Sequence, residues 1–442
     1  MKPKQLEVKP LTPPQIVKEL DRYIISQNDA KRSVAIAIRN RWRREKVRSK
    51  IKANIMPANI ILIGPTGVGK TEIARRMAGL VGAPFIKVEA SKYTEVGYVG
   101  RDVESMVRDL MNISVNMVRS EKLELVKGKA ESATEERLVD LLLPSSKKDN
   151  SSPSREKLKK MLKEGKLNKR QIELTIEMQA FPMMEVFSPL GFGDLDSSLH
   201  EMVSSMIPKQ RKKRKVSVDE ARQILLHQEV QKLVDMDDIV QDAKYRAENC
   251  GIIFLDEIDK IVGSSERVGP DVSRSGVQRD LLPIVEGSAV MTKYGIVNTE
   301  HILFFAAGAF TSSKPSDLIP ELQGRFPIRV ELKNLTKDNL RCILTEPENA
   351  LVKQYKALFA TEKVEIEFTD DALTEIAENA SYVNDTAENI GARRLQTIMS
   401  TLLEDYLFEL PVNSKKIIID AEYVKKRLQN IVKDKDLTRY IL

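Results

Sequence analysis

The chain has 442 residues, which is long for one domain and predicts two or three. Its two cysteines, Cys250 and Cys342, lie far apart and exclude a zinc ribbon or a disulfide framework, and no uncharged apolar run reaches the roughly 18 residues that a membrane helix needs. The net charge of +7 leaves nucleic-acid binding open, but part of it lies in one run, Lys209–Lys215, for which a solvated loop or helix face is the simpler interpretation.

The N-terminal residues predict two helices and no targeting segment. They contain no apolar region typical of a signal peptide, so we expect a cytoplasmic protein. Thr12 is placed to cap a first helix, with Pro13 in its first turn and Gln15 at the capping-box position. A longer helix is expected from about Gln27 to Val47, because its apolar residues recur at four-residue spacing.

Short apolar runs along the chain predict a buried parallel sheet. One is the run at Ile60–Ile63, and others lie within PFIKVEA, CGIIFLDEIDKI and EHILFFAAGAF. Helical segments alternate with these runs. Continuous apolar strands that alternate with helices are typical of an α/β domain.

The segment GPTGVGKT, Gly64–Thr71, matches the phosphate-loop pattern GxxxxGK[ST] between an apolar strand and a helix. Its glycines let successive backbone N–H groups point inward at phosphate oxygens, and the following helix adds its positive end. Lys70 is placed for the β- and γ-phosphates, and the Thr71 hydroxyl for Mg²⁺. We therefore expect ATP and Mg²⁺ as cofactors.

The loop EVGYVGRD, Glu95–Asp102, presents Tyr98 and Val99 between Gly97 and Gly100. Glycines on both sides give the backbone freedom, which favours a mobile loop over a buried turn. An aromatic and an aliphatic side chain there would suit apolar contact without sequence readout.

From about residue 104 to 243 the composition shifts to Lys, Glu, Ser and Met. Ser217 and Glu220 form a capping-box pattern, and alternation from Ile172 to Met178 predicts a short strand. We expect an inserted, mostly helical domain at 104–243 within an α/β domain made of 1–103 and 244–331. A small α+β domain is expected at 332–442, with strands near Val364–Phe368 and Lys416–Ile419.

The segment IIFLDEIDK, Ile252–Lys260, complements the phosphate loop. Its apolar strand delivers Asp256 and Glu257 to the carboxyl end of the sheet, where ligands bind in parallel sheets. Asp256 is the expected Mg²⁺ partner, and Glu257 is placed to orient or deprotonate the attacking water.

Two arginines are candidates for the cation that stabilises charge on the γ-phosphate. PELQGRFP places Arg325 in a glycine-marked turn, and NIGARRLQ places Arg393 at the start of a helix. Spacing alone leaves an ordinary surface charge open for both.

Together these motifs resemble the Clp-type AAA+ ATPases, and among them the HslU (ClpY) family. GPTGVGKT, FLDEID, PELQGRFP and NIGARRL occur in that order, and ELDRYIISQNDAKRSVAIAIRNRWRR, EVGYVGRDVES and DLTRYIL narrow the likeness. It covers nearly the whole chain and implies an AAA+ P-loop sheet with helices on both faces. The family's intermediate domain would lie between the phosphate loop and Asp256.

The resemblance implies an ATPase that unfolds proteins, is not itself a peptidase, and feeds its protein substrates through a homohexameric ring into an HslV-type peptidase. Ile25 would contact the adenine, and Glu321 and Arg325 would act in trans on a neighbouring subunit. Arg393 would sense the nucleotide. The phosphates would be wrapped by Gly67, Val68, Gly69, Lys70, Thr71 and Glu72, and the pore loop would be Gly97, Tyr98, Val99 and Gly100.

Two positions depart from the family pattern. Ser26 replaces a glycine beside the adenine, and Ala307 replaces a small polar residue on the strand FFAAG, which puts that strand's sensing role in doubt. A ClpX-like unfoldase, a nucleic-acid motor and a nucleotide-gated adaptor are the alternatives. The absent Cys₄ site, the apolar loop at Tyr98 and the presence of Glu257 argue against them in turn.

Overall fold

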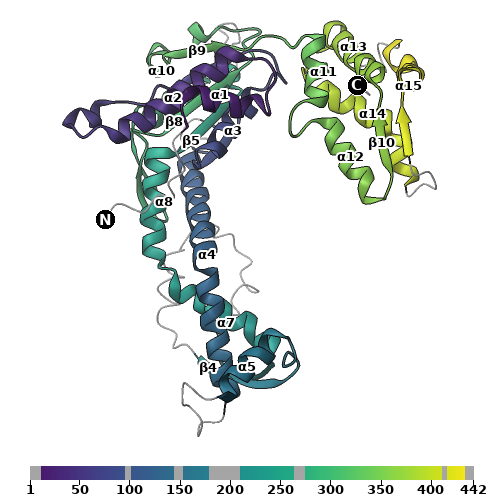
Figure 1. The fold of residues 1–442 in the computed structure, drawn as a ribbon. Helices are drawn as coiled ribbons and strands as arrows, with labels where there is room; N and C mark the ends of the chain where they lie inside the picture. The colour runs from purple at the N-terminus through teal and green to yellow at the C-terminus, as the bar shows by residue number, and fades with distance from the viewer. Residues whose placement is uncertain are drawn as a thin grey trace, which may run out of the picture. The chain divides into compact units, whose positions relative to one another are not determined.

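The central feature of the computed structural model is a five-stranded parallel sheet in the order β2-β5-β8-β1-β9 (Figure 1). The structure describes residues 11–94, 101–143, 153–178, 210–262, 274–410 and 416–433. The strands are β1 (Ile60–Ile63), β2 (Phe85–Glu89), β5 (Ile252–Asp256), β8 (Leu303–Gly308) and β9 (Ile328–Glu331). This sheet confirms the α/β fold that the apolar runs predicted.

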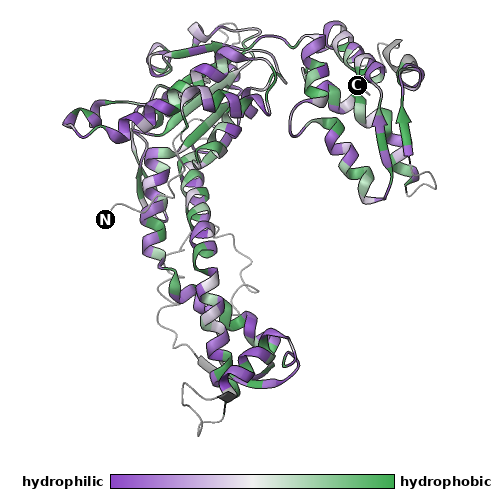
Figure 2. Ribbon diagram, in the orientation of Figure 1, coloured by the Kyte–Doolittle hydropathy of each residue, from purple (hydrophilic) through white to green (hydrophobic). Residues whose placement is uncertain are grey.

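Three helices share a hydrophobic core with one face of the sheet. They are α1 (Pro13–Asp21), α2 (Asn28–Lys46) and α3 (Lys70–Leu80). The Thr12 backbone N–H donates to Gln15 Oε1 at 2.8 Å, which confirms the predicted start of α1. Alternate strand residues such as Ile61, Ile253 and Phe304 are also fully buried, so both faces of the sheet are covered. Figure 2 shows the apolar residues concentrated along these strands.

The inserted part folds around a core of its own. Residues 118–239 form one compact unit, and residues 1–117 with 240–442 form the other. Its elements, some of which run into the second unit, are α4 (Ser105–Leu142), α5 (Pro153–Lys163), β3 (Gln171–Met178), β4 (Gln210–Ser217), α7 (Val218–Leu233) and α8 (Met236–Cys250). Since α4 and α8 pass through both units, the domain boundaries at 104 and 243 stay predictions.

The strand predicted around Ile172 is confirmed as β3, and Ser217 caps α7 by accepting the Glu220 N–H at 3.2 Å. The interpretation of the basic run was wrong. Residues 210–215 lie on β4, which pairs antiparallel with β3 in the register Glu173 to Lys215, and not on a loop or a helix face. Sheet pairing with a distant segment decides this structure, and the local charge run does not reveal it.

The C-terminal part is an α+β arrangement around a separate apolar cluster. Its elements are α11 (Lys337–Thr345), α12 (Leu351–Thr361), β10 (Glu365–Phe368), α13 (Asp370–Thr386), α14 (Arg393–Glu409), β11 (Lys416–Ile419) and α15 (Ala421–Lys433). Strands β10 and β11 pair in parallel, as the two predicted strands there allow.

Further short elements connect β5 with the end of the sheet. They are α9 (Arg274–Glu286), the antiparallel hairpin of β6 (Ala289–Thr292) and β7 (Gly295–Asn298), and α10 (Pro320–Arg325). Strand β9 was not predicted. It is an edge strand whose Arg329 and Glu331 are exposed, so it lacks the continuous apolar run of the inner strands.

Candidate functional site

The phosphate loop lies between β1 and α3, at the carboxyl end of the sheet. Gly64, Gly67 and Gly69 have φ angles of +149°, +75° and +102°, a conformation that residues with a Cβ rarely adopt. Val68 is 4% exposed and anchors the loop in the core beneath it. The curled backbone and the free N–H groups of the first turn of α3 make a cradle suited to an anion.

Lys70 opens α3 and folds back over the loop. Its Nζ donates to the carbonyl oxygens of Gly64 at 2.5 Å and Pro65 at 2.7 Å. Burial lowers the pKa of Lys70, and the nearby charge of Asp256 partly offsets this. Its ammonium therefore lies within the loop that the sequence assigned to phosphate.

The next residues of α3 have different surroundings. Thr71 is half-buried in the first turn. Glu72 is held by Arg75 at 2.5 Å and Arg76 at 2.6 Å. Although burial opposes it, the hydrogen bonds from Arg76 and Arg75 keep the pKa of Glu72 below its ordinary value. The side chain of Glu72 thus organises the surface of α3, which leaves its backbone N–H as the group that could face a phosphate.

Asp256 and Glu257 follow β5 at the same end of the sheet. Asp256 Oδ2 lies 2.7 Å from Lys87 Nζ, and its Oδ1 accepts the Glu257 backbone N–H at 3.1 Å. Glu257 has a left-handed φ of +56°, and its Oε2 accepts a hydrogen bond from Ser91 Oγ at 3.1 Å. Such a backbone conformation is costly for a residue other than glycine and is frequent at functional sites.

The turn before α14 packs directly on the phosphate loop. The Ala392 N–H donates to the Gly67 carbonyl at 3.1 Å, and a Cβ placed on Gly391 would lie 2.6 Å from the Thr66 carbonyl. Buried Asn384 holds this turn, because its Nδ2 donates to the Gly391 carbonyl at 3.1 Å. Arg393 then begins α14, as predicted, and its charge is close enough to contribute to lowering the pKa of Lys70.

The segment before α2 lies close to the phosphate loop at Gly69. Ile24 is 5% exposed and is the nearest atom group to a Cβ placed on Gly69, whereas Ile25 is half-buried. Ser26 and Gln27 both have left-handed φ angles, +63° and +58°. The contact of Ile25 with adenine therefore stays a proposal.

Arg325 is the last residue of α10, so its predicted place in a turn was wrong. Gly324 lies inside this helix, and Leu322 is its buried residue. The Arg325 guanidinium pairs with Glu286 at the end of α9 at 2.9 Å. Glu321 is exposed one turn earlier on the same helix. Their action on a neighbouring subunit stays a prediction.

The predicted pore loop, Gly97, Tyr98, Val99 and Gly100, lies outside the described residues. The residues on either side of it are described. Tyr93 pairs with Arg101 in an isolated bridge, and the Thr94 N–H donates to the Arg101 carbonyl at 3.4 Å. The two ends of the intervening segment are therefore held together.

Ala307 is fully buried on β8 in the core cluster that α1, α2 and α3 share with the sheet. It carries no polar group toward a nucleotide. The doubt that the sequence raised about a sensing role at this position therefore agrees with its place in the core.

Several residues at the site were not predicted. Lys87, Ser91 and Glu286 each contact a predicted residue from a different segment. The lysine in the middle of FIKVE gives no local indication, because β2 is an edge strand of the sheet, where charged side chains are ordinary.

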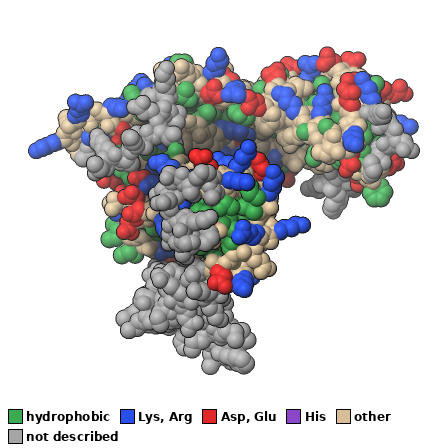
Figure 3. Space-filling model, turned by 60° about the horizontal axis from the view of Figure 1, so that its bottom comes forward, with side chains coloured by type: hydrophobic (Ala, Val, Ile, Leu, Met, Phe, Trp, Pro, Cys, Tyr) green, Lys and Arg blue, Asp and Glu red, His purple; other side chains and the backbone are tan. Residues whose placement is uncertain are grey.

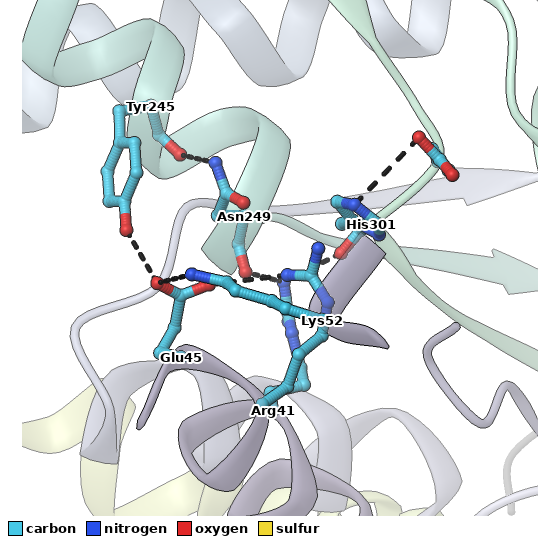
Figure 4. A network of polar contacts seen from close by, with 8 residues as sticks. Arg41, Glu45, Lys52, Tyr245, Asn249 and His301 are labelled. Carbon is cyan, nitrogen blue, oxygen red and sulfur yellow. Dashed lines mark hydrogen bonds and ion pairs between the residues drawn. The ribbon is translucent and has the colours of Figure 1, made fainter. Parts of the chain in front are cut away.

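A polar network fixes the start of β5 (Figure 4). Arg41 of α2 donates to the carbonyls of Asn249 at 2.7 Å, Cys250 at 3.1 Å and Gly251 at 3.2 Å, at the end of α8. A further bond at 3.2 Å reaches the His301 carbonyl ahead of β8. Burial lowers the pKa of Arg41 to about 10. Since Gly251 leads into β5, this network helps to place Asp256.

Three family models match the chain in sequence order. They are described as "ATPase family associated with various cellular activities (AAA)" at residues 60–155, "AAA domain (Cdc48 subfamily)" at 182–329, and "C-terminal, D2-small domain, of ClpB protein" at 335–420. A curated protein of Persephonella marina, named ATP-dependent protease ATPase subunit HslU, is 56% identical over 98% of this chain and 99% of its own length. The chain belongs to the HslU family.

Other HslU proteins agree with this assignment. Those of Oleidesulfovibrio alaskensis and Thermotoga sp. (strain RQ2), with the same printed name, are 56% and 53% identical, each over 98% of this chain and 99% of the relative. The AAA family to which the chain belongs implies nucleotide binding. None of the helices within the described residues is long and apolar enough to cross a membrane.

Proposed function

We propose that this HslU-family ATPase hydrolyses Mg²⁺-ATP to unfold proteins and to pass them into an HslV-type peptidase. One observation supports hydrolysis most directly. The phosphate loop after β1 and the acid pair Asp256–Glu257 after β5 lie at the same end of the sheet, with β8 between the two strands. Parallel sheets bind their ligands at this end.

The residues present fit Mg²⁺ as well as ATP. Asp256 and Thr71 offer the oxygen donors that Mg²⁺ prefers, and no group of three or more His, Cys, Asp or Glu side chains gathers among the described residues to make an all-protein cage. Water and phosphate oxygens would complete such a site. The metal would neutralise charge on the phosphates.

The remaining roles belong to the chain's own groups. Lys70 holds the β- and γ-phosphates, and Glu257 orients the attacking water or accepts its proton. Ser91 restrains Glu257 through the 3.1 Å hydrogen bond to its Oε2. Arg393 carries its charge to the same loop from the C-terminal part.

Hydrolysis is completed between subunits of a homohexamer. Arg325 pairs with Glu286 and keeps a side chain that is 41% exposed, as a residue that reaches a neighbouring site requires. Glu321 lies one turn earlier on the same helix. The printed name of the relatives, a protease ATPase subunit, supports a separate peptidase as the partner.

A nucleic-acid motor is the less supported alternative. On the face shown in Figure 3, basic and acidic side chains are interspersed rather than segregated. A nucleic-acid channel favours a continuous basic surface.

Glu257→Gln tests the proposal. The amide keeps the shape of the side chain but cannot accept a proton, so ATP binding should persist while hydrolysis falls by at least about 100-fold. Equilibrium binding of a fluorescent ATP analogue and steady-state phosphate release measure the two properties. The matched control is Glu362→Gln, which makes the same substitution at an exposed residue at the end of α12. It should hydrolyse ATP like the wild type. Wild-type turnover in Glu257→Gln would show that the role assigned to Glu257 is wrong.

A further inference from the structure

Lys87 lies in the middle of β2, the edge strand next to β5. In the parallel register Lys87 is opposite Phe254, and Glu89 is opposite Asp256. Residues in register point to the same face, and so do residues two apart along a strand. Lys87 and Asp256 are therefore diagonal neighbours on one face, a separation that a long side chain can bridge.

The ion pair between these two residues is close. Lys87 Nζ lies 2.7 Å from Asp256 Oδ2, and the side chains are 36% and 18% exposed. The other lysine of the site, Lys70, donates instead to the carbonyls of Gly64 and Pro65. Among the described residues, the ion pair with the Asp256 carboxylate thus comes from β2, whereas the lysine of the phosphate loop bonds to carbonyls.

We propose that Lys87 competes with the divalent cation for Asp256, so that a metal binds well only when it arrives with a polyphosphate. The inference rests on the proposed function, because it takes Asp256 as the metal-binding carboxylate. An ammonium and a divalent cation that share one carboxylate repel each other. A nucleotide polyphosphate brings negative charge and further oxygen ligands, which outweigh this repulsion. Lys87 has a flexible, partly exposed stem that lets it move aside.

Two other roles for the same ion pair predict a different effect on metal affinity. If Lys87 only steadied the edge strand, its removal would lower stability and leave metal affinity unchanged. If Lys87 held Asp256 in position for the metal, its removal would weaken metal binding. Competition alone predicts that metal binding becomes tighter, so the direction of the change decides between the three.

The test replaces Lys87 with methionine in the full-length chain, which keeps the length of the side chain and removes its charge. Mn²⁺ binding is measured from the EPR spectrum of the free ion. A second measurement is the Mg²⁺ concentration that half-saturates binding of a fluorescent ADP analogue. In Lys87→Met, we expect the Mn²⁺ dissociation constant and the half-saturating Mg²⁺ concentration to fall about five- to tenfold.

Three further variants complete the design. Lys87→Arg keeps the charge and should behave like the wild type. Lys92→Met removes a neighbouring lysine that pairs with Glu89 at 2.9 Å, and it should change neither value. Lys87→Gln repeats the neutral substitution and replaces Lys87→Met if that variant does not fold.

The outcomes separate this inference from the proposed function. Unchanged or weaker Mn²⁺ binding in Lys87→Met or Lys87→Gln, beside a wild type that binds nucleotide, overturns competition and leaves the proposed function intact. A wild type that binds no nucleotide overturns the proposed function itself. A melting curve for each variant shows whether the ion pair also contributes to stability.

Discussion

Ser26 occupies a backbone conformation that glycine adopts at little cost. Its φ of +63° is followed by +58° at Gln27, so two consecutive residues are left-handed beside the phosphate loop. Gln27 is compensated, because its Nε2 donates to the Lys333 carbonyl at 2.8 Å and its Oε1 accepts the Lys333 N–H at 3.0 Å. Ser26 carries the cost of a Cβ in this region, and among the described residues no side-chain hydrogen bond holds it in the same way.

Replacing Ser26 with glycine should stabilise the chain. The left-handed conformation costs a residue with a Cβ about 1–2 kcal/mol, and the greater freedom of glycine in the unfolded chain cancels part of that gain. We expect about 0.5 kcal/mol of net stabilisation, seen as a higher thermal midpoint of the transition of the α/β part. Ser26→Val should lower the midpoint, since a β-branched residue tolerates this conformation poorly. A lower midpoint for Ser26→Gly would contradict the strain argument.

Arg41 matters at the scale of elements, because it ties α2 to the end of α8 and to the residue ahead of β8. Its guanidinium donates to four backbone carbonyls at a helix end and ahead of two strands, one of which, that of Gly251, also accepts the Leu303 N–H at 3.1 Å. No single local pattern reveals this, since the four acceptors are more than 200 positions away in the sequence.

Arg41→Met should therefore be strongly destabilising. It removes the donor to the carbonyls of Asn249 and Cys250, whereas the Gly251 carbonyl keeps the Leu303 N–H, and we expect a loss of about 3 kcal/mol in urea unfolding. Arg43→Met changes an exposed neighbour with one hydrogen bond to Asn40 and should stay within about 0.5 kcal/mol of the wild type. Equal stability of the two variants would show that Arg41 does not stabilise the contact between α2 and the end of α8.

The elements that the sequence predicted well are those with local causes. The apolar runs at β1 and β5 and the cap at Ser217 follow from burial and from hydrogen bonds within a few residues. The predictions failed where a distant partner decides, as for the basic strand β4, in which Lys215 pairs with Glu173 of β3.

The same distinction applies to the site. The phosphate loop is one continuous pattern, so its residues could be found from spacing. Lys87 and Ser91 act on Asp256 and Glu257 across 169 and 166 positions (256 − 87 and 257 − 91), and only the register of β2 with β5 brings them together. Side-chain contacts between neighbouring parallel strands leave no mark in a single sequence.

At the scale of the whole molecule, the proposed hexamer gives the segment 95–100 its role. The chain leaves the described region at Thr94 and returns at Arg101, where the Tyr93–Arg101 bridge holds the two ends together. The bridge lies just after β2 and the short turn that carries Ser91, near the residue that restrains Glu257. We therefore predict that segment 95–100 responds to events at the nucleotide.

An unfolding motor has to grip chains of any sequence, so it needs adaptable apolar contact and not hydrogen-bond readout. We predict that Tyr98 and Val99 supply such contact, and that Gly97 and Gly100 give their loop the freedom to move. We predict that Tyr98→Ala melts like the wild type and keeps its basal ATPase rate within about twofold. Degradation of a folded substrate with the peptidase should fall at least about tenfold. Tyr98→Phe should keep most of that activity, because the ring makes the contact.

Tyr93 provides the contrasting control, because it is 4% exposed while lying only five positions earlier. Tyr93→Ala should cost about 3–5 kcal/mol of stability, as a buried aromatic truncation does. If Tyr98→Ala melted like Tyr93→Ala, Tyr98 would belong to the core and the loop would not grip. A normal melt together with normal degradation of a folded substrate would equally exclude a pore contact, whereas selective loss of folded-substrate degradation, with an unfolded substrate still degraded, would assign Tyr98 to the pulling step.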